Sequence, residues 1–281
     1  QGIEDYISGV ILFEETLMQK AKDGTRLTKI LESKGISPGI KVDKGAHPMD
    51  SSPSEKLTKG LDGLYERCLE YYKEGARFAK WRAVITIGDG IPTDDCIQAN
   101  ASALAKYAKA CQDAELVPIV EPEVLMDGDH TIETCYEVSE KTLKTVFREL
   151  ENEGVYLPGI LLKPNMVISG SECNVQGDMM AVAEMTVKCL TESVPAEVPG
   201  IVFLSGGQSE VEATEHLNAM NKMGDHPWAL SFSYGRALQQ SALKTWNGQK
   251  DNLESTYAVF HHRAEMNSLA CSGEYSSSLE I

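Results

Sequence analysis

Three lysines stand inside or at the ends of apolar runs that are typical of buried strands: Lys41 in GIKVDKG, Lys80 in FAKWR and Lys163 in LLKPNM. Burial and neighbouring positive charges both favour the neutral amine, which is the form that attacks a carbonyl to make a Schiff base. Lys163 is the best candidate nucleophile, because Pro164 ends its strand and keeps the preceding residue extended. The alternative for any one of these lysines is a structural side chain that extends from a strand end into solvent.

Two carboxylates, Glu121 and Glu123, end another apolar run, VPIVEPE. The two-residue period of a strand places both side chains on one face of the sheet. One acid beside several lysines could transfer protons while the other orients a lysine or a substrate hydroxyl. Asp43 is expected in the same network. The alternative is a set of ion pairs that only neutralises buried lysines.

Two glycine-containing loops after later strands have the composition of a phosphate site. The first precedes a helix start, so that free N–H groups and the helix dipole would point to one place. The second adds a guanidinium at the next strand end, and barrels often bind phosphate between their last two strands. The loop residues are Ser205, Gly206 and Gly207 in the first and Ser233, Gly235 and Arg236 in the second.

Each glycine taken alone is typical of a turn or a helix-packing position, and it is the presence of both loops that favours phosphate binding. Lys41 and Arg82 form a further cationic pair, which we expect to hold a second phosphate at the opposite side of the mouth.

The sequence does not contain the motifs of several other classes of enzyme. The sequence has no Walker lysine motif, no G-x-S-x-G and no H-E-x-x-H. Its six histidines are scattered over predicted loops and helices, whereas zinc chemistry needs three converging ligands. We therefore expect no metal and no cofactor.

Seven short runs rich in β-branched and apolar residues predict strands at 8–13, 39–43, 77–85, 116–121, 159–163, 200–204 and 228–233. Helical spacing lies between most of them. A capping signal at Ser52 and Glu55 predicts a helix start ahead of the apolar positions from Leu57 to Tyr72, and Ser209 with Glu212 repeats that signal. A third helical pattern runs from 138 to 150.

Strands that alternate with helices predict a parallel sheet covered by helices, either doubly wound or closed as a barrel. No G-x-G-x-x-G follows the first strand, and polar residues gather at the carboxyl ends of several strands, so the pattern favours a (β/α)₈ TIM barrel. Such a barrel needs eight strands, one more than the sequence shows. We expect a single barrel domain over residues 1–271 and a loosely held tail, SGEYSSSLEI, over 272–281.

The amino-acid composition limits the classes of molecule that the protein is expected to bind. Of the 281 residues 42% are apolar and 24% charged, which is typical of a globular protein. The net charge of −16 repels nucleic acids and anionic membranes, so neither is an expected partner, although a local group of cations can still bind a small anion. Seven cysteines without a C-x-x-C pair indicate a reducing, cytoplasmic location.

The chain resembles the class I fructose-1,6-bisphosphate aldolases, and its GDGIP and EVLMDGDH segments and short ending are similar to the bacterial branch. The resemblance covers nearly the whole chain in order, in the segments GVILFEETL, PGIKVDKG, GLDGLYERC, ARFAKWRAVI, VPIVEPEVL, LLKPNMV, FLSGGQSEVEAT, LNAMN and SFSYGRALQQSALKTW.

The resemblance implies a (β/α)₈ barrel enzyme that cleaves fructose 1,6-bisphosphate through a Schiff base on Lys163. It implies that Glu121 is the acid and base for dehydration and hydrolysis, that Lys80 lowers the pKa of the amine, and that Glu123 orients the Schiff-base lysine. Ser205, Gly206, Gly235 and Arg236 would hold the dihydroxyacetone phosphate end, with Lys41 and Arg82 at the other phosphate. The resemblance also suggests a homotetramer or homodimer.

The sequence departs from the family at one motif. The family's first strand ends in a segment resembling L-A-A-D-E-S, whose aspartate takes part in C–C cleavage, and no such segment occurs between Gln1 and Ile281. The strand count also lacks one member, so we expect that about one βα unit and a leader precede this chain in a working enzyme. The alternative is a naturally short, non-catalytic protein that binds sugar phosphates or has another role.

Overall fold

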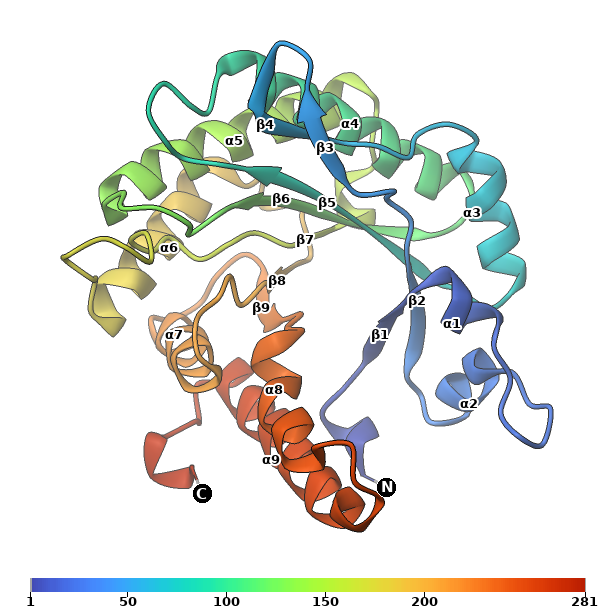
Figure 1. The fold of residues 1–281 in the computed structure, drawn as a ribbon. Helices are drawn as coiled ribbons and strands as arrows, with labels where there is room; N and C mark the ends of the chain where they lie inside the picture. The colour runs from blue at the N-terminus through green and yellow to red at the C-terminus, as the bar shows by residue number, and fades with distance from the viewer. Residues whose placement is uncertain (1, 281) are drawn as a thin grey trace.

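Seven parallel strands form one curled sheet in the computed structural model, which describes residues 2–280 (Figure 1). The strand order is β1-β2-β5-β6-β7-β8-β9. These strands are β1 (Gly9–Leu12), β2 (Ser37–Lys41), β5 (Phe78–Ile85), β6 (Val117–Val124), β7 (Leu161–Leu162), β8 (Gly200–Phe203) and β9 (Ala229–Phe232). Each strand overlaps one of the seven predicted runs, which confirms those predictions.

The long helices cover the outer side of the sheet, as in a TIM-type barrel (Figure 1). This arrangement confirms the barrel class and excludes the doubly wound alternative, which has helices on both faces of its sheet. The helices are α1 (Glu14–Met18), α2 (Leu27–Ser33), α3 (Leu64–Lys73), α4 (Asp94–Asp113), α5 (Ile132–Asn152), α6 (Met179–Ser193), α7 (Glu210–Lys222), α8 (Arg236–Trp246) and α9 (Leu253–Cys271). No helix within residues 2–280 combines the length and apolar character needed to span a bilayer.

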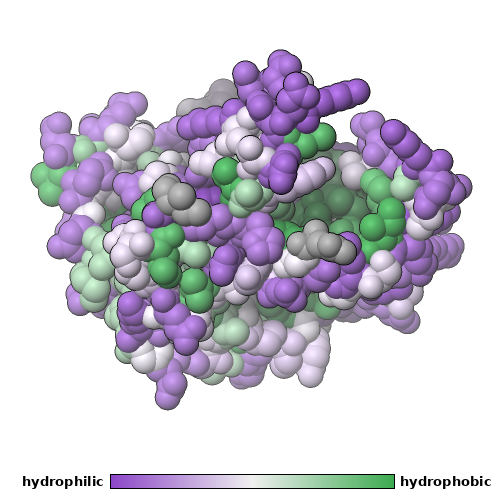
Figure 2. All heavy atoms as spheres, turned by 90° about the horizontal axis from the view of Figure 1, so that it is seen from below, coloured by the Kyte–Doolittle hydropathy of each residue, from purple (hydrophilic) through white to green (hydrophobic). Residues whose placement is uncertain are grey.

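In the described chain β1 and β9 are the two edge strands, and the sheet is open between them (Figure 1). A cavity of about 450 Å³ lies at this opening, lined by residues of β1, the end of β9 and the start of α8. Figure 2 views the molecule from below, where the sheet is open in Figure 1, and shows hydrophobic side chains at the base of a hollow. The interior of the curled sheet is therefore reached from this side.

The predicted helix start at Ser52 is wrong. Residues 46–58 form an antiparallel hairpin of β3 (Ala46–Met49) and β4 (Ser52–Thr58), and α3 begins only at Leu64, after Gly63 in the left-handed region (φ 59°). The carboxylate of Glu55 does not cap a local helix. It accepts hydrogen bonds from the backbone N (2.7 Å) and Oγ1 (2.8 Å) of Thr93, at the start of α4. A long-range contact thus outweighs the local capping signal.

Two other helix predictions are confirmed. The backbone N of Glu212 donates to Ser209 Oγ (3.2 Å), and the backbone N of Ser209 donates to the Glu212 carboxylate (2.9 Å), so α7 begins with a full capping box. This start stands in the same place as predicted because both partners lie within one turn. Helix α5 contains the predicted pattern from 138 to 150.

An aromatic pair fixes the sheet to its covering helix at the centre of the core. The rings of Trp81 on β5 and Tyr107 on α4 stack with centroids 5.5 Å apart, and both side chains are fully buried. The Tyr107 hydroxyl donates to the carbonyl of Ile119 on β6 (3.1 Å), so its polar end is also satisfied. An aromatic pair of this kind adds about 0.5–1.5 kcal/mol beyond the area it buries.

Two residues of the C-terminal segment, which the sequence predicts as a loosely held tail, contact the helices of the barrel. Tyr275 is 2% exposed, and its backbone N donates to Asn218 Oδ1 on α7 (3.0 Å). Glu280 forms an ion pair with Arg263 on α9 (2.5 Å). Tyr275 therefore contacts α7 and Glu280 contacts α9, whereas Ile281 lies outside the described residues. The serine-rich composition of this segment did not indicate these contacts, because the partners Asn218 and Arg263 are distant in sequence.

We expect Glu55→Ala to lower the free energy of unfolding by about 1–3 kcal/mol, because two donors of Thr93 lose their buried acceptor. Denaturant unfolding followed by circular dichroism measures this change. Glu70→Ala is the matched control, since the exposed Glu70 pairs with Lys73 at 3.6 Å and such pairs contribute about 0–1 kcal/mol. Equal effects of the two variants would contradict the structural role of Glu55.

Candidate active site

The register of the parallel sheet brings the predicted lysines and carboxylates to one level. Lys41 on β2 lies opposite Lys80 on β5, and Arg82 on β5 lies opposite Glu121 on β6. Lys163 follows β7 directly, and its backbone N donates to the carbonyl of Val120 (2.7 Å). Because strands alternate their side chains with a period of two, these groups share the inner face at the carboxyl ends of the strands. This is the end at which barrel enzymes place their chemistry.

Lys163 and Lys80 share one carboxylate. Glu121 Oε1 lies 3.1 Å from Lys163 Nζ, and Glu121 Oε2 lies 2.9 Å from Lys80 Nζ. All three side chains are at least nine-tenths buried. Glu121 is therefore close enough to exchange a proton with the amine of Lys163.

Burial lowers the pKa of the Lys163 amine, because the charged form loses its hydration. The carboxylate of Glu121 acts in the opposite direction, and the positive charge of Lys80 lowers the pKa again. The net shift is downward, toward the neutral amine that a nucleophile needs.

Asp43 lies in this network, as predicted. Its carboxylate contacts Lys41 Nζ at 2.5 Å and Lys80 Nζ at 3.8 Å, and it accepts a hydrogen bond from the backbone N of Gly45 (3.2 Å). Asp43 therefore lies between Lys41 and the buried Lys80, which also contacts Glu121.

Glu123 differs from its expected contact. Its carboxylate forms an ion pair with the guanidinium of Arg82, and within residues 2–280 it makes no hydrogen bond to Lys163. The residue that contacts Lys163 is Glu121. Both carboxylates lie on the same face. Arg82 on β5 lies opposite Glu121 in the register, and its side chain pairs with Glu123, two residues further along β6. Glu123 thus pairs with Arg82, one of the two cations that the sequence predicted for a second phosphate.

The loop after β8 presents free backbone donors. Gly206 and Gly207 both have positive φ values, 57° and 85°, which side chains rarely tolerate. A Cβ atom at Gly207 would also lie 2.6 Å from Met126 Sδ. The N–H groups of Gly206 and Gly207 donate to no acceptor in the described chain, and the start of α7 follows directly. Such a loop suits an anion.

The loop after β9 lies beside the loop after β8. The backbone N of Ser233 donates to the carbonyl of Phe203 (2.9 Å), which joins the two strand ends. Gly235 precedes α8, and the guanidinium of Arg236, the first residue of α8, is exposed and forms no ion pair within residues 2–280. Ser233, Gly235 and Lys163 line the same cavity of about 450 Å³.

Sequence reasoning missed Phe13. This residue follows β1, is 65% exposed and lines the cavity that contains Lys163. The Lys41 Nζ atom lies 5.9 Å from the centroid of its ring. The available signal was its position at the carboxyl end of the first strand, although an aromatic residue alone does not indicate a site.

The described residues contain no group of three or more His, Cys, Asp or Glu side chains arranged to hold a metal ion. His130 and His216 are buried, and burial lowers the pKa of both.

Comparison with known proteins gives a consistent result. The family model described as glycolytic fructose-bisphosphate aldolase class-I matches residues 1–280. A probable fructose-bisphosphate aldolase class 1 from Xanthomonas campestris pv. campestris is 56% identical over 274 residues, which cover 97% of this chain and 82% of the relative. A fructose-bisphosphate aldolase from Plasmodium falciparum is 54% identical over 277 residues, 98% of this chain and 75% of the relative.

A solved structure of Plasmodium falciparum fructose-bisphosphate aldolase, in complex with TRAP and a small molecule inhibitor, superposes with a TM-score of 0.97. It is 53% identical and covers 99% of this chain and 80% of that chain. The likeness therefore extends over the whole described fold.

We expect Lys80→Met to raise the pKa of Lys163, because it removes a neighbouring positive charge and leaves Glu121 in place. The amine should then react with an acylating reagent only at higher pH, by about one pH unit. Modification over a pH series, mapped by proteolysis and mass spectrometry, measures the change. Lys109→Met, which removes an exposed lysine on α4, is the control. An unchanged profile in Lys80→Met would contradict the assigned effect of Lys80.

Proposed function

The chain belongs to the class I fructose-bisphosphate aldolases, a glycolytic family of lyases, and we propose an assignment of their reaction to its residues. That reaction is the reversible cleavage of fructose 1,6-bisphosphate into dihydroxyacetone phosphate and glyceraldehyde 3-phosphate. One observation carries the assignment: a buried Lys163, with its pKa lowered, lies 3.1 Å from a carboxylate that also contacts a second lysine.

In the first step the neutral amine of Lys163 adds to the C2 carbonyl of the ketose and forms a carbinolamine. Glu121, which took up the proton that Lys163 lost on becoming a neutral amine, then gives this proton to the departing hydroxyl, water leaves, and an iminium remains on Lys163. Lys80 keeps Glu121 oriented between the two amines, because both lysines contact opposite oxygens of one carboxylate.

In the second step the C3–C4 bond breaks, and its electrons pass into the iminium to give an enamine. The C4 hydroxyl loses its proton to a base and becomes the aldehyde of the first product. Protonation of the enamine at C3 and addition of water then release dihydroxyacetone phosphate and restore Lys163. The family resemblance assigns the C4 proton to the L-A-A-D-E-S segment, which does not occur in residues 1–281, so we assign no residue of this chain to it.

The loops after β8 and β9 bind the phosphate of the dihydroxyacetone end in this proposal. The N–H groups of Gly206 and Gly207 and the side chain of Arg236 support it, because an anion would meet donors that have no partner in the part of the chain that the structure describes. The candidate residues are Ser205, Gly206, Gly207, Ser233, Gly235 and Arg236.

Lys41 and Arg82 bind the other phosphate. Both cations are already paired, Lys41 with Asp43 and Arg82 with Glu123. A phosphate here competes with these carboxylates, so we expect this site to hold its ligand more weakly than the loop site. Asp43 and Glu123 then act by orienting the two cations between turnovers.

We also infer a homodimer or homotetramer in a reducing, cytoplasmic compartment. All seven cysteines are free, which supports such a compartment. Light scattering of the purified protein tests the oligomeric state.

Lys163→Ala should lower kcat by about 10⁴- to 10⁶-fold, because the covalent intermediate cannot form. It should also abolish the adduct that borohydride traps in the presence of dihydroxyacetone phosphate. Intact mass spectrometry with peptide mapping measures the adduct. An adduct on another lysine in the variant would overturn the assignment of Lys163.

Arg236→Ala should raise KM for a phosphorylated ketose roughly 10- to 100-fold, since a charge-assisted contact to phosphate is lost. The effect on an unphosphorylated ketose should be small. Steady-state kinetics with both substrates separates the two effects, and an equal rise for both would indicate a structural role instead.

A further inference from the structure

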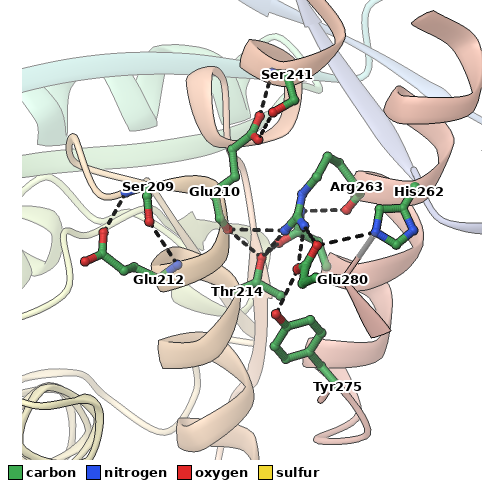
Figure 3. Close-up of polar contacts among 10 residues, drawn as sticks. Ser209, Glu210, Glu212, Thr214, Ser241, His262, Arg263, Tyr275 and Glu280 are labelled. Atoms are coloured by element: carbon green, nitrogen blue, oxygen red, sulfur yellow. Dashed lines mark hydrogen bonds and ion pairs between the residues drawn. The ribbon is translucent and has the colours of Figure 1, made fainter. Parts of the chain in front are cut away.

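A buried arginine outside the catalytic centre joins the C-terminal segment to the start of α7 (Figure 3). Arg263 on α9 is 3% exposed. Its Nη1 donates to both carboxylate oxygens of Glu280, each at 2.5 Å. Its Nη2 donates to Thr214 Oγ1 (2.8 Å) and to the backbone carbonyl of Glu210 (3.2 Å). One guanidinium thus contacts both the C-terminal segment and α7.

Glu280 supplies the negative charge that this guanidinium needs. Arg263 pairs with Glu280 and with no other carboxylate in the described chain. The Tyr275 hydroxyl also donates to Glu280 (2.8 Å). Burial opposes ionisation of Glu280, but the hydrogen bonds from Arg263 and Tyr275 hold its pKa below the usual range. The pair is therefore charged at neutral pH, and without Glu280 the arginine would be buried and unpaired.

Glu210 extends the connection to α8. It is the first residue of α7, three positions after Gly207. Its backbone carbonyl accepts from Arg263, and its carboxylate accepts from the backbone N of Ser241 (2.8 Å) and from the Ser241 hydroxyl. Ser241 lies on α8, little more than one turn beyond Arg236. The start of α7 is therefore bonded to the middle of α8 through Glu210, whose backbone carbonyl also contacts Arg263 (Figure 3).

We propose that Arg263, held by Glu280, is a positioning residue for the phosphate site, and that it sets the distance between the loops after β8 and β9. The inference rests on the proposed function, because it assumes that a phosphate lies between these loops. Neither residue touches the substrate. They act through Glu210, which is the first residue of α7 and whose carboxylate accepts hydrogen bonds from Ser241 on α8.

Glu280→Gln tests the proposal, since it keeps the shape of the side chain and removes its charge. Borohydride trapping on Lys163 of the full chain is measured over a range of dihydroxyacetone phosphate concentrations and, separately, of dihydroxyacetone. A small misplacement of binding groups can cost up to about 100-fold, so we expect roughly a tenfold rise in the half-saturating concentration for the phosphorylated ligand. Trapping with dihydroxyacetone should change little.

Ser241→Ala is the second variant, because it removes a contact at the outer end of the connection and leaves the buried arginine paired. It should show the same preference for the phosphorylated ligand, with a smaller rise. If Glu280→Gln does not fold, as judged by circular dichroism, Ser241→Ala decides alone. Asp113→Asn, which changes an exposed ion pair on α4, is the matched control and should leave both ligands unaffected.

Two results would overturn the inference: folded variants with unchanged half-saturation for dihydroxyacetone phosphate, or an equal rise for both ligands, which indicates general loosening. Failure of the proposed function looks different. In that case the unaltered protein itself gives no adduct on Lys163, or saturates at equal concentrations of the two ligands.

Discussion

The burial of the Lys163 amine is the constraint on which the rest of the site depends. A charged amine in a dry interior is unfavourable unless a carboxylate accompanies it, and a neutral amine there is a nucleophile. The inner face carries one more cation than carboxylates, so the cluster is balanced in charge when Lys163 is neutral. Its members are the cations Lys41, Lys80, Arg82 and Lys163 and the carboxylates Asp43, Glu121 and Glu123.

The parallel sheet makes this cluster possible. Strands that run in one direction end at one edge, and their register places groups from β2, β5, β6 and β7 at one level. The covering helices keep water from the outer face, while the curl of the sheet brings the loop after β9 into the cavity of Lys163 (Figure 1). Lys163 and the loop after β9, the proposed nucleophile and part of the proposed phosphate site, therefore line one cavity although they are about 70 residues apart, as expected for a barrel enzyme.

Electrostatics divides the site into two unlike halves. The protein carries a net charge of −16, yet the loops after β8 and β9 present Arg236 and backbone donors that have no partner among residues 2–280. Local potential rather than net charge decides whether an anion binds. At the other side each cation already has a carboxylate partner, so a phosphate there must exchange one partner for another. The hydrogen bond from Arg263 to Glu210 lies on the side of the loops after β8 and β9, where a phosphate can bind without displacing a carboxylate.

The sequence alone determined the seven strands, the capping box of α7 and the identity of the lysines and glycines at the strand ends, because these depend on local pattern and on strand period. The sequence misplaced the start of α3. Its capping signal included Glu55, whose carboxylate accepts hydrogen bonds from Thr93, a partner distant in sequence. Only the tertiary structure decided which carboxylate pairs with which cation. Glu121 pairs with Lys163, Glu123 with Arg82, and Glu280, in the C-terminal segment, with Arg263. The physical reason is that ion pairs form between side chains brought within a few ångströms by packing, and spacing along the chain does not encode that distance.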